Sequence, residues 1–194
     1  PVRIALQRKA APARGVTQAV YPVPTLRKSA LLVELLQRNH IDDALVFTRT
    51  KHRADRLAKL LNREGIAAER IQPQRIRALD GFKNGEYRVL VATDIAARGI
   101  DGEQLGHVVN FDVPVVPEDY IHRVGRTARA DAVGEAYTLV APEDEADLAR
   151  IERAVGSRIP RVTLDDFTDA VESQEALEVP LKAPIAANRA QKAE

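Results

Sequence analysis

The chain has 194 residues and a formal net charge of +1, and 45% of its residues are hydrophobic and 29% charged. These values predict one domain of ordinary size with appendages, and any site for a polyanion must be local because the charge is nearly balanced. The absence of cysteine excludes disulfide frameworks and thiolate metal sites. No apolar run approaches the roughly 18 residues that span a bilayer and no secretory signal opens the chain, so we expect a cytoplasmic protein without a membrane partner. The sequence contains no Met, so we expect it to be part of a longer protein.

The predicted elements alternate between helices and strands. Residues 1–24 are rich in Pro, Ala and Arg and predict a linker, whereas the segment from about 173 onward lacks periodicity and predicts a mobile tail. Strands that alternate with helices predict an α/β fold, in which helices cover both faces of a parallel sheet. In chain order we expect a helix at 26–38, a strand at 44–48, a helix at 51–64, a strand at 66–71, a helix at 74–83, strands at 88–93 and 107–111, a helix from Pro117, a strand at 134–140 and a helix at 143–155.

Residues 120–129 read YIHRVGRTAR and gather three arginines and a histidine. Clustered guanidinium groups repel one another, so this cluster indicates a nearby multivalent anion or a matching set of carboxylates. On a helix, His122 and Arg126 would share a face, and so would Arg126 and Arg129. A triphosphate fits, because arginines neutralise the charge that builds on a transferred phosphoryl group. On charge alone, a solvated basic helix end is the alternative.

Residues 90–101 read LVATDIAARGID and place polar groups directly after a predicted buried strand. Ligands of open parallel sheets bind beyond the carboxyl ends of the strands, and Gly99 can adopt a backbone conformation closed to other residues. Taken alone, Thr93 and Asp94 favour a simpler interpretation as the N-cap of a helix.

Residues 45–51 read LVFTRTK, and Thr50 could cap the helix that follows. The first turn of that helix holds Lys51, His52 and Arg53, and these basic groups oppose the helix dipole. A phosphate bound at the helix N-terminus would reverse this cost. Plain solvation of Lys51 and Arg53 is the alternative.

Together these strings resemble motifs of the DEAD-box RNA helicases, in the order in which the family carries them. HRVGRTAR at 122–129 resembles motif VI, with Ala128 in place of the common Gly, and VATDIAARGID at 91–101 resembles motif V with no departure. LVFTRTK resembles motif IV, and Gln72-Pro73-Gln74-Arg75 fits the QxxR motif of the family. With PEDYIHRVGRTAR and IPRV, the chain is most similar to the bacterial RhlE-type subgroup.

The sequence departs from the family pattern before Gln72. A short loop that the family places between the strand ending at Ile71 and this Gln is absent. Either the loop is deleted or the numbering runs on across missing residues. In the second case the Cα atoms of Ile71 and Gln72 would lie much farther apart than the roughly 3.8 Å of a bonded pair.

The resemblance implies a RecA-like fold and the C-terminal half of an ATP-dependent RNA helicase. It implies a linker at 1–24, a RecA-like helicase domain at 25–168 and a mobile tail at 169–194. Arg126 and Arg129 would be arginine fingers, Asp101 would bind the ATP ribose, and His122 would link the nucleotide site to a facing domain. By position in the motifs, the resemblance implies that His122, Arg126 and Arg129 are catalytic and that Gly99, Asp101, Arg126 and Arg129 bind ATP. It implies that RNA is bound by Thr50, Gln72, Arg75, Thr93 and Arg98. The structure of the site would be supported by Asp94, Arg123 and Gly125.

The chain holds neither a GxxxxGKT phosphate loop nor a DEAD sequence. In the family both belong to an N-terminal RecA-like domain, which would hold Mg²⁺. We therefore expect ATP with Mg²⁺ as the cofactor, RNA and that N-terminal domain as partners, no metal ligands in this chain and no ATP hydrolysis by it alone.

Two other functions stay open. One is a helicase or translocase of the same superfamily that acts on DNA, which stimulation of ATP hydrolysis by RNA or by DNA would distinguish. The other is a stand-alone module that binds RNA or protein, and the missing phosphate loop is its main support. An upstream reading frame that encodes GKT and DEAD motifs would eliminate this second function.

Overall fold

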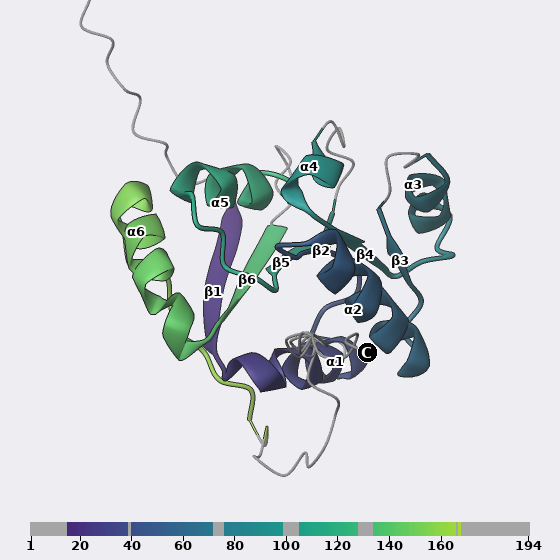
Figure 1. Ribbon diagram of the computed structural model, residues 1–194, viewed down its shortest axis with the longest axis horizontal. Coiled ribbons are helices and arrows are strands. Elements are labelled where there is room, and N and C mark those ends of the chain that lie inside the picture. The colour runs from purple at the N-terminus through teal and green to yellow at the C-terminus, as the bar shows by residue number, and fades with distance from the viewer. Residues whose placement is uncertain are drawn as a thin grey trace, which may run out of the picture.

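The computed structural model describes residues 15–38, 40–71, 76–98, 105–127, 134–165 and 167. These residues form a six-stranded sheet in the order β1-β6-β5-β2-β4-β3, in which every pairing is parallel. Figure 1 shows the sheet crossing the molecule, with α6 at the β1 side and α3 at the β3 side. The strands are β1 (Val16–Pro22), β2 (Ala44–Phe47), β3 (Ala68–Arg70), β4 (Val89–Ala92), β5 (His107–Asn110) and β6 (Gly134–Val140). The helices are η1 (Thr25–Arg27), α1 (Lys28–Gln37), α2 (Lys51–Arg63), α3 (Ile76–Lys83), α4 (Asp94–Ala97), α5 (Pro117–Val124), η2 (Pro142–Asp144) and α6 (Glu145–Val155).

Helices cover both faces of the sheet, because successive residues of a buried strand point to opposite sides. Val46 and its neighbours in β4 and β5 pack with α1 and α2 in one apolar cluster. Leu45 and its register partners Leu90 and Val108 face the other side and pack with α3 and α4. Further along that side, β1 and β6 pack against α5 and α6. The predicted parallel α/β sheet with helices on both faces is confirmed.

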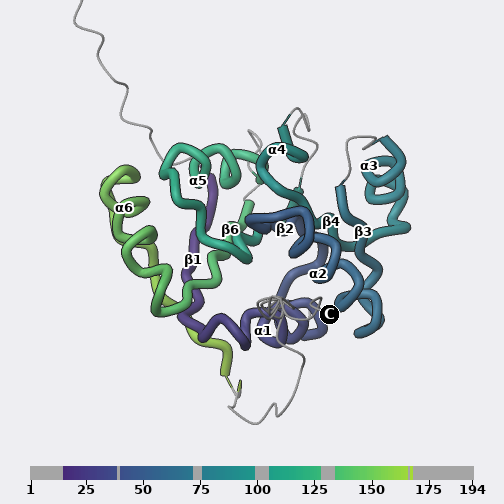
Figure 2. The backbone as a smooth tube through the Cα atoms, viewed as in Figure 1, coloured from purple at the N-terminus to yellow at the C-terminus, as the bar shows by residue number. Residues whose placement is uncertain are grey.

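Strand β1 lies where the sequence predicted the end of a linker. It pairs with β6 from Val16 to Pro22, so the first described strand lies beside the last, as the tube in Figure 2 shows. Only Ala19 and Val20 are buried in this strand, so it lacks the apolar run that marks the central strands. Pro22 is tolerated because it ends β1, which is an edge strand of the sheet. The prediction of a linker over 1–24 is therefore wrong for 16–22, and residues 1–14 lie outside the described part of the chain.

A segment after α6, residues 158–165 and 167, runs along the outer side of β1 and is called the edge segment below. The Val20 N–H donates to the Pro160 carbonyl at 2.8 Å, and the Val162 N–H donates to the Val20 carbonyl at 2.8 Å. Farther along, Phe167 packs against the α1 side of the core, and the Arg27 guanidinium lies 4.7 Å from its ring centroid. These contacts cover a strand edge that would otherwise expose unpaired backbone groups.

Candidate functional site

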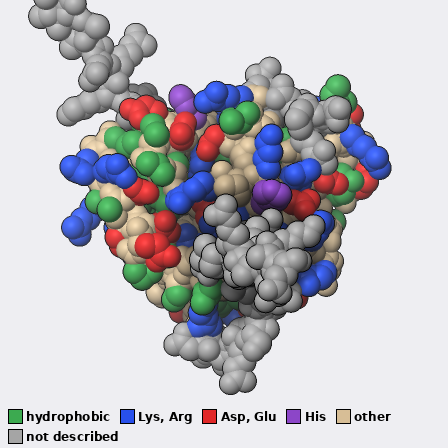
Figure 3. All heavy atoms as spheres, viewed as in Figure 1, with side chains coloured by type: hydrophobic (Ala, Val, Ile, Leu, Met, Phe, Trp, Pro, Cys, Tyr) green, Lys and Arg blue, Asp and Glu red, His purple; other side chains and the backbone are tan. Residues whose placement is uncertain are grey.

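Polar residues follow the carboxyl ends of three adjacent strands. Thr50 follows β2, Thr93 and Asp94 follow β4, and Asp112 follows β5. Since parallel strands end at the same edge of a sheet, these residues gather at one edge. In the space-filling view, Lys and Arg side chains lie over α4 and the start of α2 (Figure 3). This edge therefore combines buried polar groups with a cationic surface.

Arg123 of α5 joins the loops that follow these strands. Its Nε and Nη2 donate to Oδ1 and Oδ2 of Asp94 at 2.6 and 2.8 Å, while Nη1 donates to Asn110 Oδ1 at 3.1 Å and to the Asp112 carbonyl at 2.9 Å. The guanidinium lies 4.9 Å from the ring centroid of Phe47, and the residue is only 3% exposed. A planar guanidinium is suited to this paired geometry. Arg123 is thus held among β2, β4 and β5 and is not directed at a ligand.

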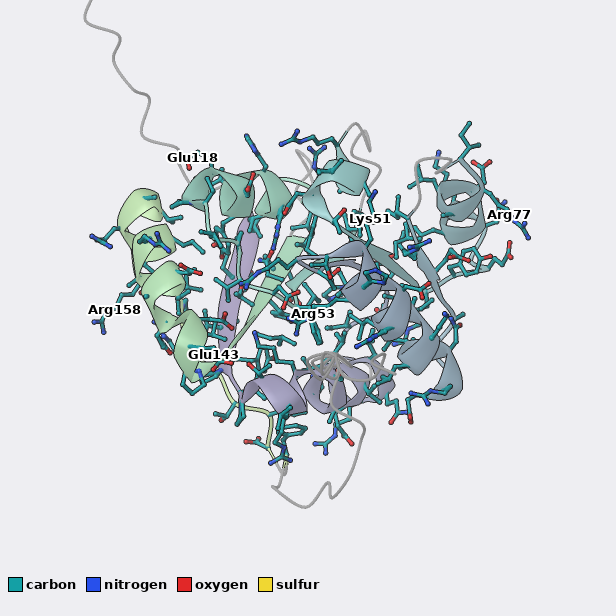
Figure 4. All side chains as sticks on the ribbon, viewed as in Figure 1. Lys51, Arg53, Arg77, Glu118, Glu143 and Arg158 are labelled. Carbon is teal, nitrogen blue, oxygen red and sulfur yellow. The ribbon has the colours of Figure 1, made fainter. Side chains whose placement is uncertain are left out.

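Asp112 has a second set of contacts with the start of α2. Its Oδ2 accepts from the Arg49 N–H at 2.7 Å, and its Oδ1 lies 3.1 Å from Arg53 Nη1. Figure 4 shows Arg53 in the middle of the molecule, between α2 and the strands, whereas Arg77 and Arg158 project from its sides. The alternative that Arg53 is simply solvated is therefore wrong. Lys51, in the same helical turn, is exposed.

Thr50 and Thr93 both precede helices but differ in what their hydroxyls do. Thr50 Oγ1 accepts from the Arg53 N–H at 3.2 Å and so caps α2, as the sequence indicated. Thr93 occupies the N-cap position of α4 but makes no capping hydrogen bond through its side chain, and it is buried. The N-cap interpretation of Thr93 thus holds for its position and not for its hydroxyl.

The buried pair of Lys28 and Asp144 was missed by the sequence interpretation. Lys28 Nζ lies 2.6 Å from Asp144 Oδ2 and 3.3 Å from the Phe111 carbonyl, and Lys28 is 2% exposed. The predicted helix at 143–155 places Asp144 in an ordinary first turn, but its carboxylate pairs with Lys28 of α1, which also donates to the residue that follows β5. The partners are far apart in the sequence, so no local spacing could have indicated the pair.

The basic cluster at 122–129 does not continue as one helix. Helix α5 ends at Val124, and the N–H groups of Arg126 and Thr127 bond to the carbonyls of Arg123 and Val124, three residues back, at 3.0 and 3.2 Å. The predicted shared helical face of His122 and Arg126 is therefore wrong. The turn is anchored by Thr127, whose hydroxyl donates to the Leu105 carbonyl at 2.8 Å. His122 lies exposed on α5, Arg126 is partly exposed in the turn, and Gly125 is the C-cap between them.

Several predicted site residues lie outside the described residues. In contrast to those residues, Arg98 is described: it lies at the C-cap of α4 and is exposed. The junction of Ile71 and Gln72 falls outside as well, so the predicted Cα separation stays a prediction. The site residues not described are Gln72, Arg75, Gly99, Asp101 and Arg129.

The described residues contain neither a cluster of metal-ligating side chains nor a helix that could span a membrane. Within the described ranges, no group of three or more His, Asp or Glu side chains is arranged to hold a metal ion. Among the same residues, no helix has the length and apolar character needed to cross a bilayer.

His107 lies at the amino end of β5, at the opposite edge of the sheet from the site. Its Nδ1 lies 3.0 Å from the Asp43 carbonyl, and its Nε2 lies 3.3 Å from Glu135 Oε2. Hydrogen bonding to Asp43, more than the nearby Glu135 charge, raises the pKa of His107 above its ordinary value. His107 therefore has a structural role in this position.

Comparison with known proteins identifies a family model and curated relatives that match this chain. The family model described as "Helicase conserved C-terminal domain" matches residues 27–131. Two curated relatives are the DEAD-box ATP-dependent RNA helicases CshA of Bacillus subtilis and Geobacillus kaustophilus, which are 39% and 38% identical over 92% of this chain. The chain spans only 37% and 39% of their respective lengths.

Similar solved structures include those of two DEAD-box proteins. The E. coli DEAD-box protein SrmB, bound to regulator of ribonuclease activity A, matches with a TM-score of 0.73 and 36% identity over 82% of this chain and 98% of that one. S. cerevisiae Dbp5 bound to RNA and ADP BeF3 matches with a TM-score of 0.73 and 31% identity over 83% of this chain and 45% of that one.

Proposed function

The chain belongs to the helicase conserved C-terminal domain family, within the DEAD-box group, and from this premise we propose that it is the C-terminal half of an ATP-dependent RNA helicase. Its predicted RecA-like fold is confirmed by the match to these DEAD-box domains. The observation that carries the proposal is the buried Arg123, whose contacts hold α5 against the end of β2 and against the residues at the ends of β4 and β5. This brings the motif VI turn and the motif IV and V loops into one unit.

On the nucleotide side, we propose that Arg126 and Arg129 act as arginine fingers. A guanidinium placed at the γ-phosphate stabilises charge that develops during phosphoryl transfer. Arg126 follows directly on the helix that Arg123 holds, so its backbone is positioned before any ligand arrives. Asp101 and Gly99 would bind the remainder of ATP, and His122, exposed on α5, would contact the facing domain.

Mg²⁺ is proposed to be held by the N-terminal domain and not by this chain. The sequence has no DEAD string, and in the resembled family that string belongs to the N-terminal domain. This chain would supply cations to the triphosphate, and the facing domain would supply the phosphate loop and the metal ligands.

On the RNA side, we propose that Thr50, Thr93 and Arg98, with Gln72 and Arg75, contact the sugar-phosphate backbone. Thr50 lies at the N-terminus of α2, where the helix dipole favours an anion, and its hydroxyl can donate a proton while it accepts from Arg53. Aromatic residues are only 4% of the chain, so a platform of stacked bases is not favoured. Contacts to backbone groups would give little sequence preference.

The proposed cycle couples the two ligands. With ATP and RNA bound, the two RecA-like domains would close, and the RNA contacts of both would combine into a bent path that a duplex cannot follow. Short duplexes would separate locally, and hydrolysis would reopen the cleft. We propose a cytoplasmic location, where ATP and RNA are both available.

A narrower proposal concerns the subgroup. The strings PEDYIHRVGRTAR, at 117–129, and IPRV, at 159–162, support membership of the bacterial RhlE-type subgroup. The second string lies in the edge segment, and residues 117–127 of the first span α5 and the turn after it.

The test of the function is ATP hydrolysis by this chain alone and joined to its upstream domain, with RNA or DNA present. We expect activity only in the joined protein, with stimulation by RNA. Arg129→Ala should lower the rate by about 1000-fold or more, the range found for arginine fingers. Arg158→Ala is the matched control, because Arg158 projects from the outside of the molecule (Figure 4). Equal stimulation by DNA, or no activity in the joined protein, would contradict the proposal.

A further inference from the structure

We propose that Thr127 is a positioning residue for Arg126, because its hydroxyl fixes the turn after α5 to the residues that begin β5. The inference rests on the proposed function, since it takes Arg126 to be an arginine finger. Thr127 belongs to none of the proposed catalytic, ATP-binding or RNA-binding sets. It is 4% exposed, so it acts through its neighbour and not by touching a ligand.

The turn after α5 is held only weakly by its own backbone. Helix α5 ends at Val124, and the N–H groups of Arg126 and Thr127 bond to carbonyls three residues back, at 3.0 and 3.2 Å. Hydrogen bonds with this spacing have poorer geometry than those of an α-helix. Gly125 lies between the helix and the turn, and glycine restricts the backbone less than any other residue. The direction in which Arg126 leaves the turn therefore depends on a further restraint.

The hydroxyl of Thr127 supplies that restraint. Its Oγ1 lies 2.8 Å from the Leu105 carbonyl oxygen and 2.9 Å from that of Gly106, so both accept from its single hydrogen. The Gly106 carbonyl also accepts from the Glu135 N–H at 3.1 Å, and the Gly106 N–H donates to Asp43 Oδ1 at 3.1 Å. The acceptors are thus held by β6 and by the segment before β2. The turn is fastened to a part of the sheet that does not depend on any ligand.

The turn also lies directly on the start of β6. A Cβ at Gly134 would come within 2.4 Å of Thr127 Oγ1 and 1.8 Å of the Thr127 carbonyl oxygen. The hydroxyl therefore occupies a space that the bare backbone of Gly134 leaves open. A methyl group in its place would fill this space without a hydrogen bond, and the buried Leu105 would lose the donor to its carbonyl.

The position of Arg126 should matter more for the rate of hydrolysis than for the binding of ATP. A guanidinium that acts on the transferred phosphoryl group stabilises charge that develops in the transition state. Loss of an interaction made only in the transition state lowers kcat, and a displacement of about 1 Å can cost roughly 100-fold. Removal of the Thr127 hydroxyl should therefore lower kcat and leave the KM for ATP nearly unchanged.

The experiment compares Thr127→Val, which keeps the shape and removes the hydroxyl, with Thr127→Ser, which keeps the hydroxyl. Both are made in the chain joined to its upstream domain, and kcat and KM for ATP are measured with saturating single-stranded RNA. We expect Thr127→Val to lower kcat by roughly 10- to 100-fold at nearly constant KM. Thr127→Ser should restore most of the rate.

A second measurement uses a mimic of the transition state. ADP with aluminium fluoride places a charged group where the γ-phosphate is transferred, whereas ADP alone lacks it. The affinity for ADP with aluminium fluoride should fall in Thr127→Val and recover in Thr127→Ser. The affinity for ADP alone should equal that of the wild type in both variants.

Tyr120→Phe is the matched control for the stability of α5. It also removes a buried hydroxyl from this helix, one that donates to Gln18 Oε1 at 2.7 Å. It should lower the midpoint of urea unfolding, as Thr127→Val does, while kcat stays at the wild-type value. If Tyr120→Phe lowers kcat as much as Thr127→Val, any loosening of α5 has the same effect and the specific role of Thr127 is overturned.

Arg126→Ala distinguishes failure of the inference from failure of the proposed function. If Arg126→Ala lowers kcat by about 1000-fold or more and Thr127→Val leaves it unchanged, Thr127 is purely structural. If the wild-type joined protein does not hydrolyse ATP, or if Arg126→Ala keeps the full rate, the proposed role of Arg126 fails, and the positioning role of Thr127 fails with it.

Discussion

Arg123 shows how one side chain can organise a site without binding a ligand. Its guanidinium is removed from water, a cost that is offset only when its N–H groups find partners with good geometry. Here Asp94, Asn110 and the Asp112 carbonyl supply those partners, and the Phe47 ring covers one face of the plane. The neighbouring residues of motif VI are therefore positioned by a contact that the fold itself provides.

Replacing Arg123 by methionine should be strongly destabilising. Asn110 and the Asp112 carbonyl would lose a donor in the interior, while Asp94, whose side chain is 33% exposed, would be partly hydrated. We expect the free energy of unfolding of this domain to fall by about 2–4 kcal/mol, which is below the roughly 3–5 kcal/mol for a fully buried pair because Asp94 is partly exposed. Urea unfolding measures it as a lower midpoint at constant slope. Lys59→Ala, which breaks an exposed pair with Asp55, should cost about 0.5 kcal/mol or less. Equal losses for the two variants would show that Arg123 is not the buried tie described above.

The sequence could predict those residues whose role is written in a local string. Arg123, Asp94 and Thr50 were found because they stand in recognisable motifs. Asp112 and Lys28 were not, because their partners lie 63 and 116 residues away and no spacing reports such a contact. Only the parallel sheet, which brings the ends of β2 and β5 together, makes Asp112 a neighbour of Arg49.

At the scale of elements, the predictions succeeded where a single physical signal dominates. The central strands β2 and β4 are apolar throughout and buried on both faces, so a short apolar run marks them. Helix α5 begins at Pro117 as predicted, but its end depends on Thr127, whose hydroxyl reaches carbonyls of the chain before β5. That contact is not local, and it explains why the helix was expected to be longer.

The start of β6 is packed so closely against the α5 turn that only glycine fits at position 134. A Cβ there would lie 1.8 Å from the Thr127 carbonyl oxygen, which is backbone and cannot rotate away. We expect Gly134→Ala to lower the free energy of unfolding by about 3 kcal/mol, the upper part of the overpacking range. Gly156→Ala is the comparison, because a Cβ there meets open space and only the left-handed φ of 82° costs stability. That cost is about 1 kcal/mol. A midpoint in urea that falls no further for Gly134→Ala than for Gly156→Ala would contradict the close approach.

At the scale of the whole molecule, the two ends of the described chain close the same side of the sheet. Strand β1 pairs with β6, and the edge segment then pairs with Val20 on the other side of β1. Neither pairing could be predicted from the sequence, because β1 has a weak apolar signal and the edge segment has no regular one. The helices and central strands supply the layers of the fold, and these terminal segments complete its β1 side.

Shortening the chain should show where the domain ends. A chain that ends at Ser157 loses buried Ile159, the packing of Leu164 and Phe167 and both backbone hydrogen bonds to Val20. From the burial of Ile159 and the lost hydrogen bonds, we expect a loss on the order of 4 kcal/mol, a large part of the 5–15 kcal/mol typical of a domain. The uncovered edge of β1 should also promote self-association, visible as a larger mass in light scattering after gel filtration. A chain that ends at residue 168 keeps these contacts and should unfold at the same urea concentration as the full chain. A marked loss in that longer variant would show that residues 169–194 belong to the folded domain, and that the predicted domain end at 168 is wrong.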